Sequence, residues 1–200
     1  MKSAQCTLIS VTPYSQSQTI DPDEHPKLSK ELPDAYEKRC WRQRMHVTST
    51  GLVEIPQTAF ENSIKEAAKR LQIPIPGKRM QYFTKSFEAG FAVLGGLTLE
   101  VKAADVKGER LFVPSDGRPG GGKRVWKWFP RIESWSGIIT CMVYDDVITE
   151  DVFRRVVESA GLLVGIGRFR PQNRGFYGRF RLDRMVWNND ATASFGQAAE

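Results

Sequence analysis

Segments with the spacing and composition of strands recur along the chain. Residues 5–11 alternate apolar and polar side chains, and residues 52–55 form a short strand-like segment. Residues 138–144 are apolar on both faces, which favours a buried central strand. Residues 176–187 alternate again. These segments predict at least four strands.

Two other segments repeat their apolar side chains at the helical period. Thr58 and Glu61 have the spacing of a capping box and predict the start of the first helix. Thr149 is the predicted N-cap of the second helix, and Gly161 is its predicted end. The apolar faces consist of Phe60, Ile64, Ala67, Ala68 and Leu71 in the first helix and of Val152, Phe153, Val156, Val157 and Ala160 in the second.

The remaining segments complete the predicted order of elements. Residues 12–34 are rich in Pro, Ser and Asp and predict a long loop, and residues 80–135 contain several further strands. One of these strands completes a βαββαβ order, the α+β plan of ferredoxin-like and RRM-like folds. We therefore predict one domain, residues 1–187, with a long loop after the first strand, a β-rich insertion at about 80–135, and a flexible tail, residues 188–200.

The composition is that of an ordinary globular protein. Of its 200 residues, 40% are hydrophobic and 10% aromatic, enough for a core without covalent staples. Cys6, Cys40 and Cys141 lie far apart and form no CxxC or Cys/His cluster, which predicts buried thiols, no disulfide framework and no metal site. The first residues are too polar for a signal peptide or a membrane span, which predicts a cytoplasmic protein with no membrane partner.

Basic residues are concentrated in two windows that contain no acidic residue. The net charge of the chain is only +6, yet residues 118–131 and 164–182 together hold ten basic residues in 33 positions. They are Arg118, Lys123, Arg124, Lys127 and Arg131 in the first window and Arg168, Arg170, Arg174, Arg179 and Arg181 in the second. Such a local excess favours an acidic partner.

Glycines and aromatic residues accompany the basic residues in both windows. Glycine lets a backbone approach a phosphate, arginine presents a planar fork to it, and flat aromatics stack on unpaired bases. We therefore expect RNA or single-stranded DNA to contact Lys123, Arg124, Trp126, Lys127, Trp128, Gly165, Gly167, Arg168, Arg170, Arg174, Tyr177, Arg179 and Arg181. Neither glycine cluster has the spacing of a Walker loop or a dinucleotide fingerprint, so no cofactor is expected.

Alternation assigns faces to these side chains. In the closing strand it predicts a core face of Phe176, Gly178, Phe180 and Leu182 and an exposed face of Tyr177, Arg179 and Arg181. Trp126 and Trp128 share one face of their strand, so both are expected to be exposed or both to be buried. The alternative to nucleic-acid binding is an arginine-rich edge that only discourages sheet aggregation.

Two motifs resemble the RAMP superfamily, the RRM-fold proteins of CRISPR effector complexes. GLVEIPQTAFENSIKEAAKRL, residues 51–71, resembles that family's strand and helix start, although the usual glycine and lysine are replaced by TAFEN. AGLLVGIGRFRPQNRGFYGRF, residues 160–180, resembles its glycine-rich loop, which touches RNA. The matching glycines are Gly161, Gly165, Gly167, Gly175 and Gly178. The size is most like the backbone subunits that polymerise along a guide RNA, and the PYSQS and RFRP segments also resemble phage or prophage proteins.

The resemblance implies RNA and other copies or other subunits of a ribonucleoprotein complex as partners. Some RAMP proteins are metal-independent endoribonucleases that use a histidine, and in some backbone subunits an aspartate after the first strand cuts RNA. His25, Asp21 and Asp23 are the corresponding candidates here, and with Glu24 the two aspartates offer carboxylates for magnesium. The simpler interpretation is a solvated acidic loop and structural histidines.

Three functions of different classes therefore remain open. The first is a non-catalytic protein that coats RNA or another single strand, and the second is an endoribonuclease of the same fold. The third is a protein-interaction module, such as a phage protein that imitates a CRISPR subunit. Salt-dependent binding separates the first from the third, and a cleavage gel identifies the second.

Overall fold

A four-stranded antiparallel sheet, in the order β3-β7-β1-β8, forms the centre of the computed structural model, which describes residues 1–115 and 122–190. Its strands are β1 (Lys2–Ser10), β3 (Phe91–Leu94), β7 (Ser136–Val143) and β8 (Phe180–Asn188). α2 (Gln57–Leu71) lies between β1 and β3 in the chain, and α4 (Glu150–Ser159) lies between β7 and β8. The chain thus follows the βαββαβ order, which confirms the predicted α+β, ferredoxin-like fold.

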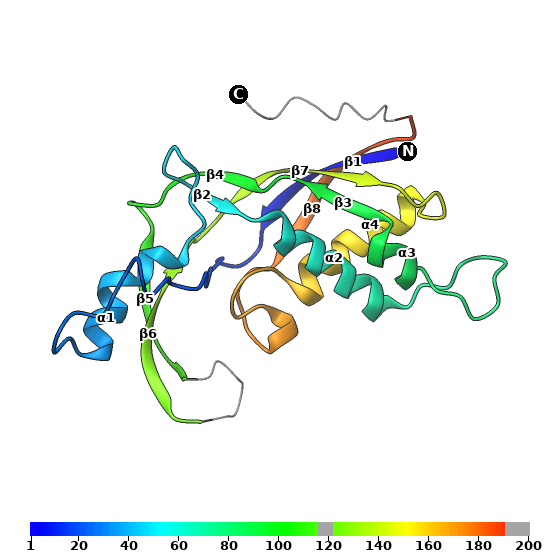
Figure 1. The fold of residues 1–200 in the computed structure, drawn as a ribbon. Coiled ribbons are helices and arrows are strands. Elements are labelled where there is room, and N and C mark those ends of the chain that lie inside the picture. Colours follow the sequence, from blue (N-terminus) through cyan, green and yellow to red (C-terminus); the bar gives the residue numbers. More distant parts are fainter. Residues whose placement is uncertain (116–121, 191–200) are drawn as a thin grey trace.

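Both helices cover the same face of the sheet (Figure 1). The predicted apolar faces of α2 and α4 are buried there, against the inward side chains Ala4, Cys6 and Leu8 of β1. Side chains on the other face of the sheet, such as Gln5 of β1, are exposed. Ile138 in β7 is 59% exposed on that side, so the prediction that β7 is buried on both faces is wrong for its first half.

The two helix starts differ from each other. Thr149 caps α4 as predicted, because its side chain accepts a hydrogen bond from the Val152 N–H. The capping box predicted for α2 is wrong. That helix begins at Gln57 after Pro56, with no side-chain cap, and Glu61 instead accepts a hydrogen bond from the Val93 N–H at 3.0 Å.

The predicted end of the second helix is also wrong. The chain continues past Gly161 through a π-helical turn, Ala160–Val164, and leaves it at Gly165 with φ of 73°. Gly161 is buried against Phe180, where a side chain would collide with the Phe180 carbonyl oxygen. The glycine therefore allows a close helix–strand contact and does not stop the helix.

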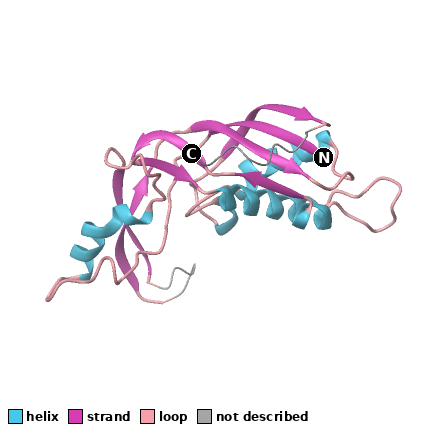
Figure 2. Ribbon diagram, turned by 45° about the horizontal axis from the view of Figure 1, so that its top comes forward, coloured by secondary structure: helices cyan, strands magenta, loops and turns pink. Residues whose placement is uncertain are grey.

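Several further elements are inserted into this plan. They are α1 (Pro33–Cys40), a 3-10 turn (Trp41–Arg44), β2 (Leu52–Ile55), α3 (Thr84–Ala89), β4 (Leu97–Lys102), β5 (Lys107–Pro114), β6 (Arg124–Arg131) and a 3-10 turn (Pro171–Asn173). β2 pairs with β4, and β5 pairs with β6 in a hairpin. The hairpin and α1 project from one end of the molecule, and the loop of residues 72–83 projects from the other (Figures 1 and 2).

Some sequence predictions concern residues outside the described ranges. The first basic window includes residues 118–121, and the predicted tail includes residues 191–200. The division into one domain, residues 1–187, and a tail, residues 188–200, therefore stays a prediction. Along residues 1–115 and 122–190, no helix has the length and apolarity to cross a membrane.

The three cysteines are buried free thiols, as predicted. Cys6 and Cys141 lie on the neighbouring strands β1 and β7, where their side chains meet in the core. A hydrogen bond with Cys6, together with burial, raises the pKa of the Cys141 thiol.

Candidate nucleic-acid interface

The C-terminal basic window forms a compact loop, which we call the Gly/Arg loop, residues 165–179. The Ile166 N–H donates to the Gly178 carbonyl at 2.9 Å and closes the loop on itself. The Gly178 N–H donates to the Pro13 carbonyl and the Arg168 N–H to the Ser15 carbonyl, at 2.8 and 2.9 Å. The loop is therefore fixed to the segment that follows β1.

Close packing accounts for the glycines of this loop. Gly165, Gly167 and Gly178 have φ of 73°, 71° and 75°, a region that L-residues avoid. A side chain at Gly167 would collide with Tyr14 and the Ser15 carbonyl, and one at Gly178 would collide with the Ile166 carbonyl. The space beside these glycines, which a side chain would otherwise fill, is thus occupied by other atoms of the protein. That phosphates contact Gly165 and Gly167 stays a prediction.

Arg168 is the most enclosed arginine of the loop. Its guanidinium carbon lies 3.7 Å from the centre of the Phe129 ring and 4.5 Å from that of Phe169, and one nitrogen donates to the Ser17 hydroxyl at 3.0 Å. Burial lowers its pKa to about 10, which leaves it charged at neutral pH. Within the described ranges it makes no ion pair.

The other arginines of the window differ in how far their charge is neutralised. Arg170 donates to the Gln172 side chain, and Arg179 to the carbonyls of Leu162 and Phe176, none of which carries a negative charge. Arg174 is exposed. Arg181 pairs with Asp183 at 2.7 Å, which makes it the least available for a phosphate.

The predicted alternation fails before Phe180, where β8 begins. Phe176 was expected in the core but is 62% exposed. Tyr177 was expected to be exposed but is half-buried, and its hydroxyl donates to Glu109 at 2.6 Å. Burial and this hydrogen bond raise the pKa of Tyr177 to about 12. A strand period does not apply to residues that form a loop.

A groove of about 300 Å³ lies where the Gly/Arg loop meets the start of α2. Its walls include Gln18, His46, Thr58, Asn62, Arg168 and Arg170, and none of the described residues that line it is acidic. The N-terminus of α2 adds its partial positive charge. Residues 56–62 and 167–170, which carry the two motifs singled out in the sequence, thus face one space.

The hairpin of β5 and β6 has two faces with different neighbours. One face contacts the Gly/Arg loop: Phe129 and Phe169 meet edge to face with centroids 5.8 Å apart, and Glu109 binds both Tyr177 and Arg131. The register places Trp126 and Trp128 on the opposite face, because they pair with Phe112 and Arg110. The tryptophans therefore do not share a surface with the Gly/Arg loop.

The two tryptophans also differ in exposure, although both were expected to be exposed or both to be buried. Trp126 is 46% exposed, lies 5.0 Å from the Phe112 ring and is covered by Arg110 at 4.4 Å. Trp128 is half-buried and packs against the core beside Trp41.

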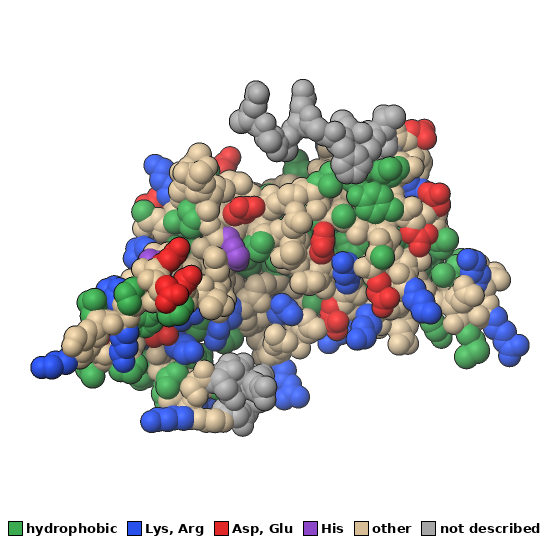
Figure 3. All heavy atoms as spheres, viewed as in Figure 1, with side chains coloured by type: hydrophobic (Ala, Val, Ile, Leu, Met, Phe, Trp, Pro, Cys, Tyr) green, Lys and Arg blue, Asp and Glu red, His purple; other side chains and the backbone are tan. Residues whose placement is uncertain are grey.

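The remaining basic candidates lie near the hairpin tip. Arg124 donates to the Phe112 carbonyl at 2.6 Å, Lys127 to the Ser115 carbonyl at 3.5 Å, and Lys123 is exposed. In the space-filling view, Lys and Arg side chains recur along the lower side, from the hairpin to the loop of residues 72–83 (Figure 3). Arg118 lies outside the described residues.

The candidates for catalysis border a separate cavity of about 530 Å³. Asp21, Glu24 and His25 line it together with His46, whereas Asp23 does not. Within residues 1–115 and 122–190, no three His, Cys, Asp or Glu side chains are grouped so that they could hold a metal ion.

Several residues of this region were missed by the sequence analysis. Gln16 is buried and bonds the backbone of two neighbouring segments, and Phe129 stacks on Arg168. In the sequence, Gln16 was noticed only as part of the PYSQS segment, which lies in the predicted long loop.

Comparison with known proteins finds likeness at the level of structure only. No family model and no curated protein matches the chain. Cmr6 from Pyrococcus furiosus is similar with 12% identity and a TM-score of 0.44, over 90% of this chain and 97% of that one. A chain of a CRISPR RNA-guided surveillance complex is similar with 9% identity and a TM-score of 0.36, over 88% and 65%.

Proposed function

We propose that the protein binds a single strand of RNA, or of DNA, along the groove between the Gly/Arg loop and the start of α2. The observation that carries this proposal is the groove itself, in which Arg168 and Arg170 stand beside a helix N-terminus and none of the described lining residues is acidic. Arginine forks and helix N-termini are the groups that bind phosphates most readily. The strand's backbone therefore lies against these two arginines.

The packing around the groove supports a preformed site. Arg168 is held between two aromatic rings and the Ser17 hydroxyl, so little side-chain entropy is lost when it meets a phosphate. The exposed Phe176 ring, in the same loop, offers a flat surface to an unpaired base.

Replacement of Arg170 and Arg174 by alanine tests this function, because neither guanidinium is buried in the packing of the loop. Affinity for short oligonucleotides should fall about equally for all sequences, because phosphates carry no base information. The slope of log K against log salt should become shallower by about 0.7 for each lost contact. Fluorescence anisotropy at several salt concentrations measures both.

A matched control removes the same charge elsewhere. Lys78→Ala with Arg79→Ala lies in the loop of residues 72–83, at the far end of the molecule (Figure 1). This variant should keep the affinity and slope of the unaltered protein on a short strand. Equal losses in both double variants would show that only net charge matters, and would remove the groove from the binding site.

The same oligonucleotides distinguish binding from cleavage. We expect RNA to be recovered intact after incubation with or without magnesium. Cleavage that is lost in His25→Ala or Asp21→Ala would instead make the protein an endoribonuclease and would place the reaction in the cavity that these residues line.

We further propose that copies of the protein assemble along the strand. Leu28 and Leu32 are 58% and 72% exposed at the end that carries α1, and Met80 and Tyr82 are 83% and 45% exposed in the loop at the opposite end. Large apolar side chains exposed on projecting segments are typical of contact surfaces. A contact between unlike ends repeats and gives an open array.

A further inference from the structure

Both histidines of the chain border the cavity of about 530 Å³, although 20 residues separate them in the sequence. His25 comes from the long loop after β1, and His46 follows the 3-10 turn Trp41–Arg44. Asp21, Glu24 and Arg42 also line it. Glu54 lines it as well, but its carboxyl group lies against Gly96. The volume is within the range of small-molecule pockets, roughly 300–1,000 Å³.

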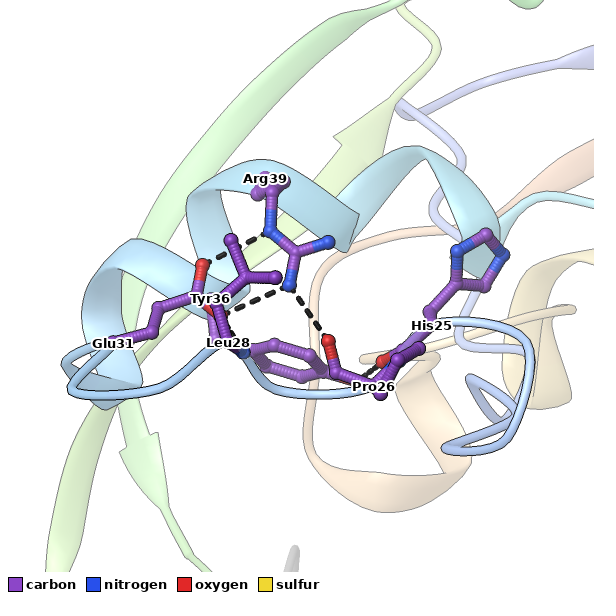
Figure 4. Close-up of polar contacts among 6 residues, drawn as sticks. All are labelled: His25, Pro26, Leu28, Glu31, Tyr36 and Arg39. Carbon is purple, nitrogen blue, oxygen red and sulfur yellow. Dashed lines mark hydrogen bonds and ion pairs between the residues drawn. The ribbon is translucent and has the colours of Figure 1, made fainter.

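Hydrogen bonds fix the loop that forms one wall of this cavity. The Tyr36 hydroxyl donates to the His25 carbonyl at 3.0 Å, and Arg39 donates to Glu31 and to the Pro26 carbonyl (Figure 4). The hydrogen bond from Arg39 lowers the pKa of Glu31 to about 2, so Glu31 is ionised and paired with Arg39 at neutral pH. In the close-up the His25 ring points away from Arg39.

A buried glutamine fixes the opposite wall. The Gln16 amide donates to the Glu54 carbonyl and accepts from the His46 N–H, both at 2.6 Å. Gln16 is 2% exposed and satisfied on both sides, so it holds these two residues in place. The cavity is therefore preformed and needs no rearrangement to receive a ligand.

The cavity adjoins the groove and carries the opposite charge. Gln18 and His46 line both spaces. Histidines aside, the groove has two arginines and no described acid, whereas the cavity has Asp21 and Glu24 beside one arginine, Arg42. A phosphate is attracted to the first space and repelled from the second. The part of a nucleotide that suits the second is uncharged and rich in hydrogen-bond donors.

We propose that the cavity receives one base of the bound strand and reads its donor edge, with guanine preferred. This inference rests on the proposed binding of the strand in the groove. Guanine presents an N1–H and an N2 amino group side by side, which one carboxylate accepts together. Uracil presents a single N–H between two carbonyls, which repel a carboxylate. Adenine and cytosine each offer one amino group and rank between them.

The test uses the full-length protein and oligonucleotides of uridine in which one position is changed to guanosine, adenosine or cytidine. One guanosine, at the position that reaches the cavity, should tighten binding roughly tenfold, as for a well-formed bidentate base contact. Guanosine at other positions should change affinity little.

Paired variants assign the preference to the cavity. Asp21→Asn with Glu24→Gln removes two charges, and the asparagine oxygen can still accept the Asp23 N–H that Asp21 binds. This double variant should lose most of the tenfold preference, and its affinity for oligomers of uridine alone should not fall, because neither phosphate nor uracil gains from these carboxylates. Asp23→Asn, in the same loop but outside the cavity, should keep the preference.

The outcomes separate this inference from the proposed function. Binding to uridine oligomers without base preference at any position would refute the base-reading cavity and leave the groove intact. A guanine preference that survives Asp21→Asn with Glu24→Gln would place base reading elsewhere. Failure of every oligonucleotide to bind would overturn the proposed function itself.

Discussion

Glycine is the residue type whose role changes most between sequence and structure. In a basic window, glycines are read as places where the backbone meets phosphates, and residue type alone cannot exclude this. The structure shows Gly167 against Tyr14 and Gly178 against the Ile166 carbonyl, contacts between segments far apart in the chain or across a loop. Spacing in the sequence carries no information on such contacts, so the packing role of these glycines could not be predicted.

Comparison of Gly178→Ala with Gly77→Ala tests this packing role. Both glycines have φ of 75°, but a side chain at Gly77 meets nothing within 4 Å. Gly77→Ala should lower the free energy of unfolding by about 1–2 kcal/mol, the cost of the left-handed backbone. Gly178→Ala should cost roughly 1–3 kcal/mol more, because the neighbouring carbonyl must move. Chemical denaturation measures both, and equal losses would contradict the packing role.

Arg168 shows what residue type can predict and what it cannot. An arginine among glycines and aromatics predicted a phosphate contact, and the groove places Arg168 where such a contact can form. Its stacking on Phe129 joins two windows that are separate in the sequence. The same side chain therefore supports the loop and faces the groove, which is why the binding test relies on Arg170 and Arg174 instead.

At the scale of elements, the strands and helices of the central plan were predictable because their periods are regular. α2 and α4 were predicted from apolar stripes that are buried in the structure. α1 and α3 were missed. They have 8 and 6 residues, each with one buried side chain, and such short segments show no periodicity. The start of α2 and the end of α4 were also misplaced, because Glu61 and Gly161 make tertiary contacts, with the Val93 N–H and with Phe180.

In the hairpin of β5 and β6, the sequence predicts which side chains share a face of a strand but not what packs against that face. Trp126 and Trp128 do lie on one face of β6, as their spacing requires. Burial differs because Trp128 is near the base, beside Trp41, and Trp126 is nearer the tip. The sequence does not show how far along a hairpin the core extends.

Alanine at each tryptophan should separate these two positions. Trp128→Ala should lower the free energy of unfolding by about 3 kcal/mol, as for other aromatic residues packed in a core. Trp126→Ala should leave stability within about 0.5 kcal/mol. If a strand also reaches the outer face of the hairpin, Trp126→Ala should weaken binding by roughly 1–3 kcal/mol. Unchanged affinity would restrict the strand to the groove side.

At the scale of the whole molecule, only some of the described residues of the two basic windows meet. Phe129 and Arg131 contact the Gly/Arg loop, whereas Trp126 and Arg124 face the other side of the hairpin. The described residues of the two windows therefore contribute to two surfaces. The order of the core elements was predictable from local periods. The placement of the insertion was not, because it depends on pairings such as β2 with β4 that join distant segments.

The two projecting ends make assembly testable without disturbing the groove. Shortening the loop after β1 would remove Gln16 and with it the bonds to His46 and Glu54, so point changes on exposed tips are preferable. Leu28→Ser with Leu32→Ser alters one end, and Met80→Ser with Tyr82→Ser alters the other. Each change removes exposed apolar surface and should leave the fold and the single-site affinity on short RNA unchanged.

On RNA several sites long, the unaltered protein should bind cooperatively, with a complex mass that rises stepwise with RNA length. Each double variant alone should bind without cooperativity, because every contact between unlike ends needs one intact tip of each kind. A mixture of the two variants should recover cooperativity on RNA that holds two sites and should gain nothing further on longer RNA. Analytical ultracentrifugation of the complexes distinguishes these cases. A cooperative response retained by either variant alone, or only single copies on long RNA, would show that these ends do not form the contact.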